Sequence, residues 1–221
     1  DSQDLERLFR RAGDHRFGAA DDDRAFDQDR ILRHCRDQLV LAQQVRIEPK
    51  GRGFLTPQKL MRAEFEFLQQ ALDANANMLR VWGGGLYATD EFYDACDEMG
   101  ILVWQDMLFA CAAYPEEEPI RSLVEQELRY NVARLSHHAS LAIWNGCNEN
   151  VWGYHDWGWK QEGLVKDRTW GPGYYFDLIP KVLKELDPAR PYWAASPWSG
   201  DTDVEKGLHP NLASHGNKHV W

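Results

Sequence analysis

An asparagine and a glutamate follow a short apolar run in residues 141–150, and the two side chains together could do chemistry. The run ends at Trp144, and polar residues follow it, among them Asn148 and Glu149. Such runs are typical of buried strands, and in barrels of alternating strands and helices catalytic groups project from the carboxyl ends of strands. A glutamic acid there can protonate a glycosidic oxygen while an amide bonds a sugar hydroxyl. The segment fits a sugar-cleaving site, and it fits equally a strand that ends in a polar loop.

Tryptophan is abundant in the same part of the chain. All ten tryptophans follow residue 80, and several lie at or near the ends of predicted strands. Indole rings that gather around carboxylates suit pyranose sugars, whose apolar faces stack on aromatic rings. Core packing explains the same residues, so the pattern supports a sugar site without requiring one.

The elements that must position these residues alternate between helix and strand from about residue 56. Apolar residues at helical spacing predict helices, and short apolar runs between them predict strands. The expected helices cover residues 57–75, 90–99, 118–136 and 174–186, and the expected strands cover residues 78–82, 101–104, 141–144, 191–194 and 218–221. This order predicts an α/β fold built on a parallel sheet.

Two features favour a barrel over an open doubly wound sheet. No GxGxxG sequence follows a first strand, and polar or aromatic residues recur at several strand ends instead of at one crevice. The glycines at residues 83–85 lack the lysine and the serine or threonine of a phosphate-binding loop. We interpret them as a tight turn that leaves space beside the site.

Composition argues against several classes of partner. The formal net charge of −10 argues against nucleic acid, which requires a basic face, and no apolar run approaches the ~20 residues that span a bilayer. The four cysteines are scattered without the spacing of zinc ligands, which favours reduced thiols and a cytoplasmic protein. No motif predicts a metal or an organic cofactor.

Seven segments carry specific motifs in a fixed order. They are NMLRVWGGGLY at residues 77–87, EFYD at 91–94, GILVWQD at 100–106, FACAAYP at 109–115, WNGCNEN at 144–150, WGWK at 157–160 and RPY at 190–192. In combination they resemble the β-mannosidases of glycoside hydrolase family 2, over about residues 56–221. The resemblance implies a catalytic (β/α)₈ TIM barrel that follows β-sandwich domains. It also implies retaining hydrolysis of terminal, non-reducing β-D-mannose.

The resemblance gives four residues a role. Glu149 matches the general acid/base, and Asn148 matches the residue that bonds the axial 2-hydroxyl of mannose. Trp82 is similar to the aromatic wall of the sugar subsite, and Trp157 is expected to contribute another wall.

Three further candidates keep more than one interpretation. Asp106 ends its strand, where it could bond a sugar hydroxyl or orient Arg80, or serve as a buried partner of Arg80 without touching sugar. His219 could face the site from the last strand, and core packing accounts for it equally well.

The chain departs from the family at both ends. The family's nucleophile is a glutamate at the end of the seventh barrel strand, and no residue here matches it, so we expect the chain alone to be inactive. Residues 1–55 are highly charged and resemble neither the sandwich domain nor the first barrel strand, although residues 31–45 could form a helix. The expected fold is a partial barrel, from the first helix through the sixth strand, whose exposed edges could self-associate.

Two alternatives to a β-mannosidase remain at this point. One is the same fold with another exo-glycosidase specificity, of the β-glucuronidase or β-galactosidase type. The other is an inactive remnant that binds sugar without cleaving it.

Overall fold

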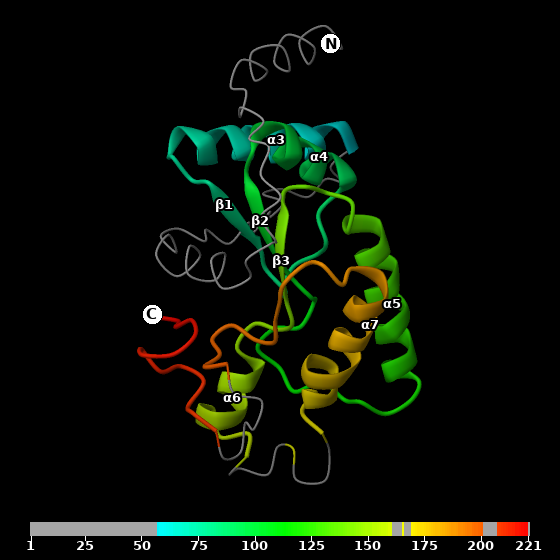
Figure 1. The fold of residues 1–221 in the computed structure, drawn as a ribbon, viewed down its shortest axis with the longest axis vertical. Helices are drawn as coiled ribbons and strands as arrows, with labels where there is room; N and C mark the ends of the chain where they lie inside the picture. Colours follow the sequence, from blue (N-terminus) through cyan, green and yellow to red (C-terminus); the bar gives the residue numbers. More distant parts are fainter. Residues whose placement is uncertain (1–56, 161–164, 166–168, 201–206, 221) are drawn as a thin grey trace, which may run out of the picture.

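The centre of the fold is a parallel sheet of four strands, and the computed structural model describes residues 57–160, 165, 169–200 and 207–220. The strands are β1 (Met78–Val81), β2 (Leu102–Asp106), β3 (Leu141–Asn145) and β4 (Tyr192–Trp193). Their order in the sheet is their order in the chain, with helices in each connection (Figure 1). The α/β class and the parallel sheet predicted from the alternation are confirmed.

Strand β3 is the most deeply buried of the four, with all five residues buried. An apolar strand without alternation is typical of a sheet that is covered on both faces. In β2 only Leu102, the first residue, is exposed, and the remaining four are buried. Both strands end in a buried polar residue, Asp106 and Asn145, which lie opposite each other in the β2–β3 register.

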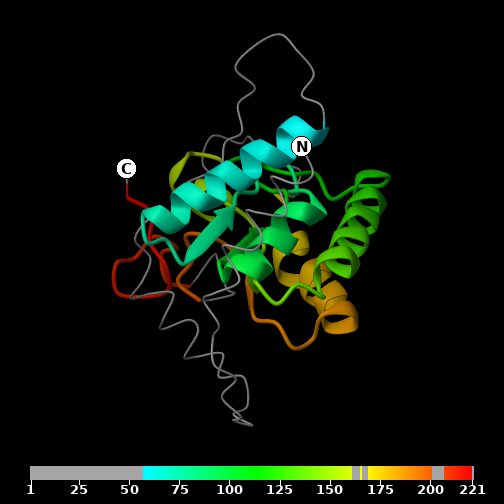
Figure 2. The same ribbon diagram turned by 90° about the horizontal axis from the view of Figure 1, so that it is seen from above.

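Helices cover the sheet in two pairs. Helix α3 (Pro57–Asp73) packs against α4 (Asp90–Met99), and α5 (Ile120–Leu135) packs against α7 (Ile179–Leu186). In Figure 1 the first pair crosses the end of the sheet where the strands begin, and the second pair runs along one side; Figure 2 shows the same pairs from above. The largest fully buried side chains of this core are Trp144, Tyr93, Tyr174, Tyr175, Leu68, Leu79, Ile101, Met107, Leu128, Leu135, Ile143 and Ile179.

The predicted helices are present, with differences at their ends. Gly100 takes the left-handed conformation (φ 70°) at the end of α4, which confirms it as the stop signal. The helix expected over residues 174–186 begins with a π-helical turn, η1 (Tyr174–Leu178), before α7. Pro180 lies in the first turn of α7, where its missing N–H matters least, and this position explains why the hydrogen-bond pattern changes just before it.

At the end of the molecule that carries Glu149, the structure adds one element and lacks one that was expected. The segment after Glu149 forms a short helix, α6 (Asn150–Asp156), which the sequence analysis did not assign. The strand expected at residues 218–221 does not form over residues 218–220, and Trp221 lies outside the described residues. The backbone N–H of His219 donates to the Asn211 side chain, which in turn donates to the His219 carbonyl, so these groups are used outside any ladder.

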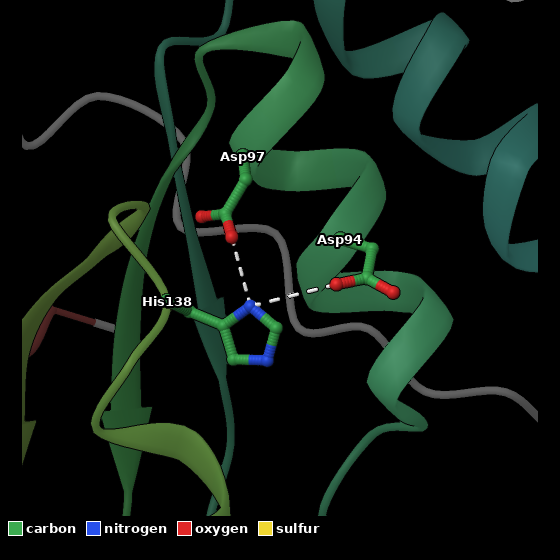
Figure 3. A group of neighbouring side chains, drawn as sticks. All are labelled: Asp94, Asp97 and His138. Carbon is green, nitrogen blue, oxygen red and sulfur yellow. Dashed lines mark hydrogen bonds and ion pairs between the residues drawn. The ribbon is translucent and has the colours of Figure 1, made fainter.

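At the amino end of the sheet, where the strands begin, a carboxylate ties α4 to the start of β3. Asp97 accepts hydrogen bonds from the Ser140 backbone N–H (2.6 Å) and from Nδ1 of the buried His138 (2.8 Å), as Figure 3 shows for the imidazole. Asp94 lies on the solvent side, 3.9 Å from the same nitrogen. Burial alone would raise the pKa of Asp97, but the bonds from Ser140 and His138 hold it below its ordinary value. This cluster is a structural tie, because its imidazole nitrogen is already bonded to Asp97.

Several expectations lie outside the described residues. They concern the charged segment of residues 1–55 and the helix expected at residues 31–45. Within the described ranges, no helix combines the length and the apolar character needed to cross a membrane.

Candidate active site

The carboxyl end of the sheet, where the strands end, brings the predicted site residues together. The ladders continue past the strands as single bridges, which join Ala110 to Asn148 and Asn148 to Ser196. Two backbone hydrogen bonds accompany these bridges. The N–H of Asn148 donates to the carbonyl oxygen of Phe109 (2.9 Å), and the N–H of Glu149 donates to that of Ser196 (2.8 Å). The loops after β2, β3 and β4 are therefore held side by side, with the Asn148–Glu149 pair in the middle.

Asp106 is the hub of this end of the sheet. Its carboxylate is fully buried and accepts the Arg80 guanidinium through two nitrogens, at 2.8 to 3.2 Å. It also accepts the Gly83 backbone N–H (3.1 Å), the Trp104 indole N–H (3.0 Å) and the Asn145 amide (2.8 Å). Because a carboxylate offers about four lone-pair sites, these donors occupy its capacity. Asp106 therefore orients Arg80 and leaves no acceptor for a sugar hydroxyl.

Arg80 fixes the orientation of the Asn148 amide. Its Nη2 donates to Asn148 Oδ1 (3.0 Å), so the amide oxygen faces the guanidinium and the amide nitrogen faces away from it. That nitrogen lies 3.3 Å from Cys111 Sγ, a weak acceptor. The amide of Asn148 is thus held as a hydrogen-bond donor toward the Cys111 side of the site.

The backbone at Glu149 turns sharply to start α6. Glu149 is the N-cap of this helix and adopts the left-handed conformation (φ 66°, ψ 0°), which costs an L-residue about 1–3 kcal/mol. Its side chain does not cap the helix. The side chain points back toward the loops instead and is 3% exposed, which is rare for a glutamate.

The two oxygens of the Glu149 carboxyl group have unequal neighbours. Oε1 lies 2.6 Å from Nδ1 of His219, a short contact with a strong partner. Oε2 lies 3.5 Å from Cys111 Sγ, a long contact with a weak donor. One oxygen is therefore firmly held and the other is nearly free.

Cys111 is a site residue that the sequence analysis did not single out, although it lies within the FACAAYP motif. The residue as a whole is exposed, but its sulfur lies against Asn148 and Glu149. Desolvation of the sulfur, together with the charge of the Glu149 carboxylate, raises the pKa of the Cys111 thiol above its ordinary value. The thiol is therefore protonated and neutral at physiological pH.

Trp82 follows β1 and its ring lies over the glycine turn. A side chain on Gly84 would come within 2.0 Å of the Trp82 ring, and one on Gly83 would come within 2.5 Å of the Met107 carbonyl. The glycines thus leave space for the Trp82 ring and for the loop after β2, and the N–H of Gly85 closes the turn on Trp82. The Trp82 indole nitrogen is buried without a hydrogen-bond partner in the described part of the chain.

Trp157 ends α6 at the rim of an aromatic cluster. It is 36% exposed, and its ring lies 5.8 Å from those of Trp152 and Trp159. Trp152 in turn meets the His219 ring edge-on at 6.5 Å. Trp157 therefore lies on the α6 side of Glu149. A series of contacts, from Trp157 to Trp152 and from Trp152 to His219, connects it with the carboxyl group.

Comparisons with known proteins show the family of this chain. No protein-family model matches the chain. The "Beta-mannosidase" of Bos taurus is 42% identical over 163 residues, which are 70% of this chain and 18% of the relative. The "Beta-mannosidase B" of Thermothelomyces thermophilus is 36% identical over 172 residues, which are 75% of this chain and 19% of the relative.

A solved structure gives the same result. The crystal structure of beta-D-mannosidase from Dictyoglomus thermophilum matches with a TM-score of 0.64 and 39% identity, and covers 76% of this chain and 19% of that one. The chain thus spans about a fifth of the length of these relatives, which are glycoside hydrolases. In sequence and in fold, the chain is a β-mannosidase-like segment of the glycoside hydrolase family 2 type.

Proposed function

We propose that this chain forms part of a retaining exo-glycosidase that hydrolyses terminal, non-reducing β-D-mannose residues, with Glu149 as the general acid/base. One observation carries the proposal: Glu149 is almost completely buried, yet only one of its oxygens has a strong partner. A buried carboxyl group with one free oxygen beside an oriented amide donor suits proton transfer to a bound sugar. The mannoside specificity is carried over from the relatives, whose names state it.

Glu149 acts twice in this mechanism. As an acid it gives its proton to the glycosidic oxygen while a second carboxylate attacks the anomeric carbon, so the leaving group departs as an alcohol. As a base it then takes a proton from the water that cleaves the covalent glycosyl intermediate, and both carboxyl groups return to their starting states. Retention requires the second carboxylate ~5–5.5 Å away, and we assign it to sequence beyond this chain.

The surrounding residues bind and orient the sugar. The Asn148 amide, held as a donor by Arg80, bonds the 2-hydroxyl, and this bond strengthens as the oxocarbenium-like transition state forms. Trp82 and Trp157 provide aromatic walls, and the unpaired indole N–H of Trp82 offers a donor to a hydroxyl. Arg80 and Asp106 position the amide and do not need to touch the sugar.

The proposal also covers the complete fold, self-association and the cellular compartment. We assign residues 56–221 to a (β/α)₈ barrel of which β1 to β4 are consecutive strands, and further strands would pair with the outer edges of β1 and β4. Without those strands the same edges would favour self-association. We also expect a cytoplasmic protein, from the scattered cysteines, of which Cys96, Cys111 and Cys147 in the described residues are free.

The test is a comparison of three substrates on the complete gene product. We expect hydrolysis of an aryl β-mannoside to exceed that of the matching β-glucoside and β-glucuronide, with β-mannose as the first product by NMR. Faster hydrolysis of the glucuronide or the glucoside would replace the mannosidase proposal with another specificity. Mannose binding without turnover would indicate a sugar-binding remnant, and α-mannose as the first product would contradict retention.

A further inference from the structure

Glu149 is the first member of a part-buried hydrogen-bond chain that leads away from the site. His219 Nδ1 lies 2.6 Å from Glu149 Oε1, and His219 Nε2 lies 2.8 Å from Ser196 Oγ. Ser196 Oγ in turn lies 2.6 Å from the side-chain nitrogen of Asn217. Both imidazole nitrogens are therefore in use, so His219 has no nitrogen left to bond a sugar hydroxyl.

The far end of this chain fixes which atoms donate. Asn217 Oδ1 accepts the Trp193 indole N–H (2.9 Å) and the Trp198 backbone N–H (3.0 Å), and both of these groups can only donate. The amide oxygen of Asn217 is thus identified, and its nitrogen must face Ser196. Ser196 Oγ therefore accepts a hydrogen bond from Asn217 and keeps its own hydrogen for another partner.

The carboxylate at the other end of the chain selects the tautomer of His219. An ionised carboxylate can only accept, so in the neutral ring Nδ1 carries the hydrogen, and the bare Nε2 accepts the Ser196 hydroxyl. The Nδ1–H then donates to Oε1 of Glu149. The donor direction runs from Asn217 through Ser196 and His219 to Glu149 without a break.

We propose that His219 is a positioning residue that determines which oxygen of Glu149 carries the catalytic proton. The inference rests on the proposed function of Glu149 as acid/base. Because Oε1 always accepts the Nδ1–H, the proton of the acid form is directed to Oε2. Oε2 has only the weak thiol contact of Cys111, so its proton is available to a glycosidic oxygen. Oε1 stays in place as the carboxyl group cycles between its acid and base forms.

The packing around His219 supports a fixed role for its ring. The ring is 17% exposed and meets Trp152 edge-on, and its backbone is held in both directions by the Asn211 side chain. An imidazole that is held from its backbone, its face and both nitrogens has little freedom to turn. Such a ring can hold a carboxyl oxygen in place at little further loss of conformational entropy.

The first test reads the tautomer directly and does not depend on turnover. Histidine labelled with ¹⁵N is incorporated into the complete gene product, and His219→Gln assigns the His219 signals. We expect a protonated Nδ1 and an unprotonated Nε2 in the ligand-free protein, and Ser196→Ala should disturb this pattern. A protonated Nε2 beside a bare Nδ1 would overturn the inference while leaving the role of Glu149 intact.

The second test uses the dependence of rate on the leaving group. An acid proton matters for a poor leaving group, such as a sugar alcohol, and hardly matters for dinitrophenolate, which departs without protonation. We expect His219→Phe to lower kcat/KM for mannobiose about 10–100-fold, as the loss of one hydrogen bond to a charged group implies. The kcat/KM for dinitrophenyl β-mannoside, which reports the first chemical step alone, should fall far less.

Two further variants make the outcome decisive. His219→Gln keeps an amide N–H that can reach Oε1, so it should recover part of the loss on mannobiose. His215→Gln is the matched control, because His215 is exposed in the same segment and is bonded to Ser214, away from Glu149, and it should behave as wild type. An equal loss on both substrates, or no loss, would refute the positioning role. If the wild type cleaves no β-mannoside, or Glu149→Gln has no effect, the proposed function itself fails.

Discussion

The two ends of the sheet each hold a part-buried carboxylate–imidazole pair, and the two pairs differ in what the second carboxylate oxygen bonds. At the amino end, His138 Nδ1 lies 2.8 Å from Asp97, whose other oxygen accepts the Ser140 backbone N–H at 2.6 Å. At the carboxyl end, His219 Nδ1 lies 2.6 Å from Glu149, whose other oxygen has only a thiol at 3.5 Å. The first carboxylate is fully satisfied, and the second is half free.

This difference separates a structural pair from a reactive one. Both oxygens of Asp97 are bonded, and these bonds hold α4 to the start of β3. In the Glu149 pair, Oε1 is bonded just as closely. The left-handed backbone at Glu149 turns the side chain away from the end of α6, and Oε2 is left without a strong partner. Burial and a histidine partner are therefore poor signals of function by themselves. The free oxygen is the informative feature.

The largest expected effect on activity comes from replacing the Glu149 carboxyl group, at the carboxyl end of the sheet, with an amide. Glu149→Gln keeps the shape of the side chain but cannot donate or accept the catalytic proton. We expect kcat/KM for mannobiose to fall about 10²–10⁴-fold, the usual contribution of general acid–base catalysis, with little change in the unfolding midpoint. Asp97→Asn is the matched control and should retain kcat. Equal activity losses in the two variants would remove the contrast between the two ends.

Asp106→Asn should give the largest loss of stability. The substitution leaves the Arg80 guanidinium without a buried counter-charge and disturbs three other donors, so we expect about 3–5 kcal/mol of destabilisation in urea unfolding. Glu185→Gln, which breaks an exposed ion pair with Arg129, should leave the midpoint nearly unchanged. A stable Asp106→Asn protein would show that the hub is dispensable.

Asp97→Asn should be destabilising at neutral pH and less so in acid. Loss of a bond between a charged carboxylate and its donors costs about 1–3 kcal/mol. Because the pKa of Asp97 is lower in the folded state, its contribution is fully present above the ordinary aspartate pKa of ~3.9 and disappears as pH falls through the lower folded value. Urea unfolding of both proteins from pH 7 to pH 3 should show the gap closing, and a constant gap would contradict this account.

The smallest effect is expected at the thiol beside the free oxygen. Cys111→Ser keeps a neutral donor of similar size near Oε2, and a sulfur contact at 3.5 Å contributes little energy. We expect kcat and KM within about threefold of wild type, since a ~0.6 kcal/mol change is about threefold in rate. A loss approaching that of Glu149→Gln would mean that the thiol takes part in proton transfer.

The sequence sufficed for the sheet and for the neighbourhood of Glu149. Apolar runs without alternation predicted β1, β2 and β3 to within one or two residues, and polar residues at their ends predicted which end carries the site. The strand expected at residues 218–221 was wrong because local side-chain bonds from Asn211 decide that backbone, and periodicity does not register such bonds. The π-helical turn at η1 was missed for the same reason, since it depends on the geometry around one proline.

For the candidate site, too, the sequence predicted some features and the structure was needed for others. Residue types predicted Glu149, Asn148, Arg80 and Asp106 as a group, but the direction of each hydrogen bond could come only from the fold. Ser196 and Asn217, which continue the hydrogen-bond chain beyond His219, lie 21 residues apart in sequence and carry no recognisable spacing. Asp106 had three possible roles in the sequence, and its five donors disfavour direct sugar contact and leave the roles of a buried partner of Arg80 and of orienting that residue.

The most direct test of the central claim is chemical rescue of Glu149→Ala in the complete gene product. With dinitrophenyl β-mannoside the first step needs no acid, so the variant should stall at the step in which Glu149 activates water. Azide, a small nucleophile that needs no base, should fit beside the shortened side chain and restore turnover. Our account predicts acceleration by azide and formation of β-mannosyl azide. A variant as active as wild type without azide, or one that azide does not accelerate, would contradict it.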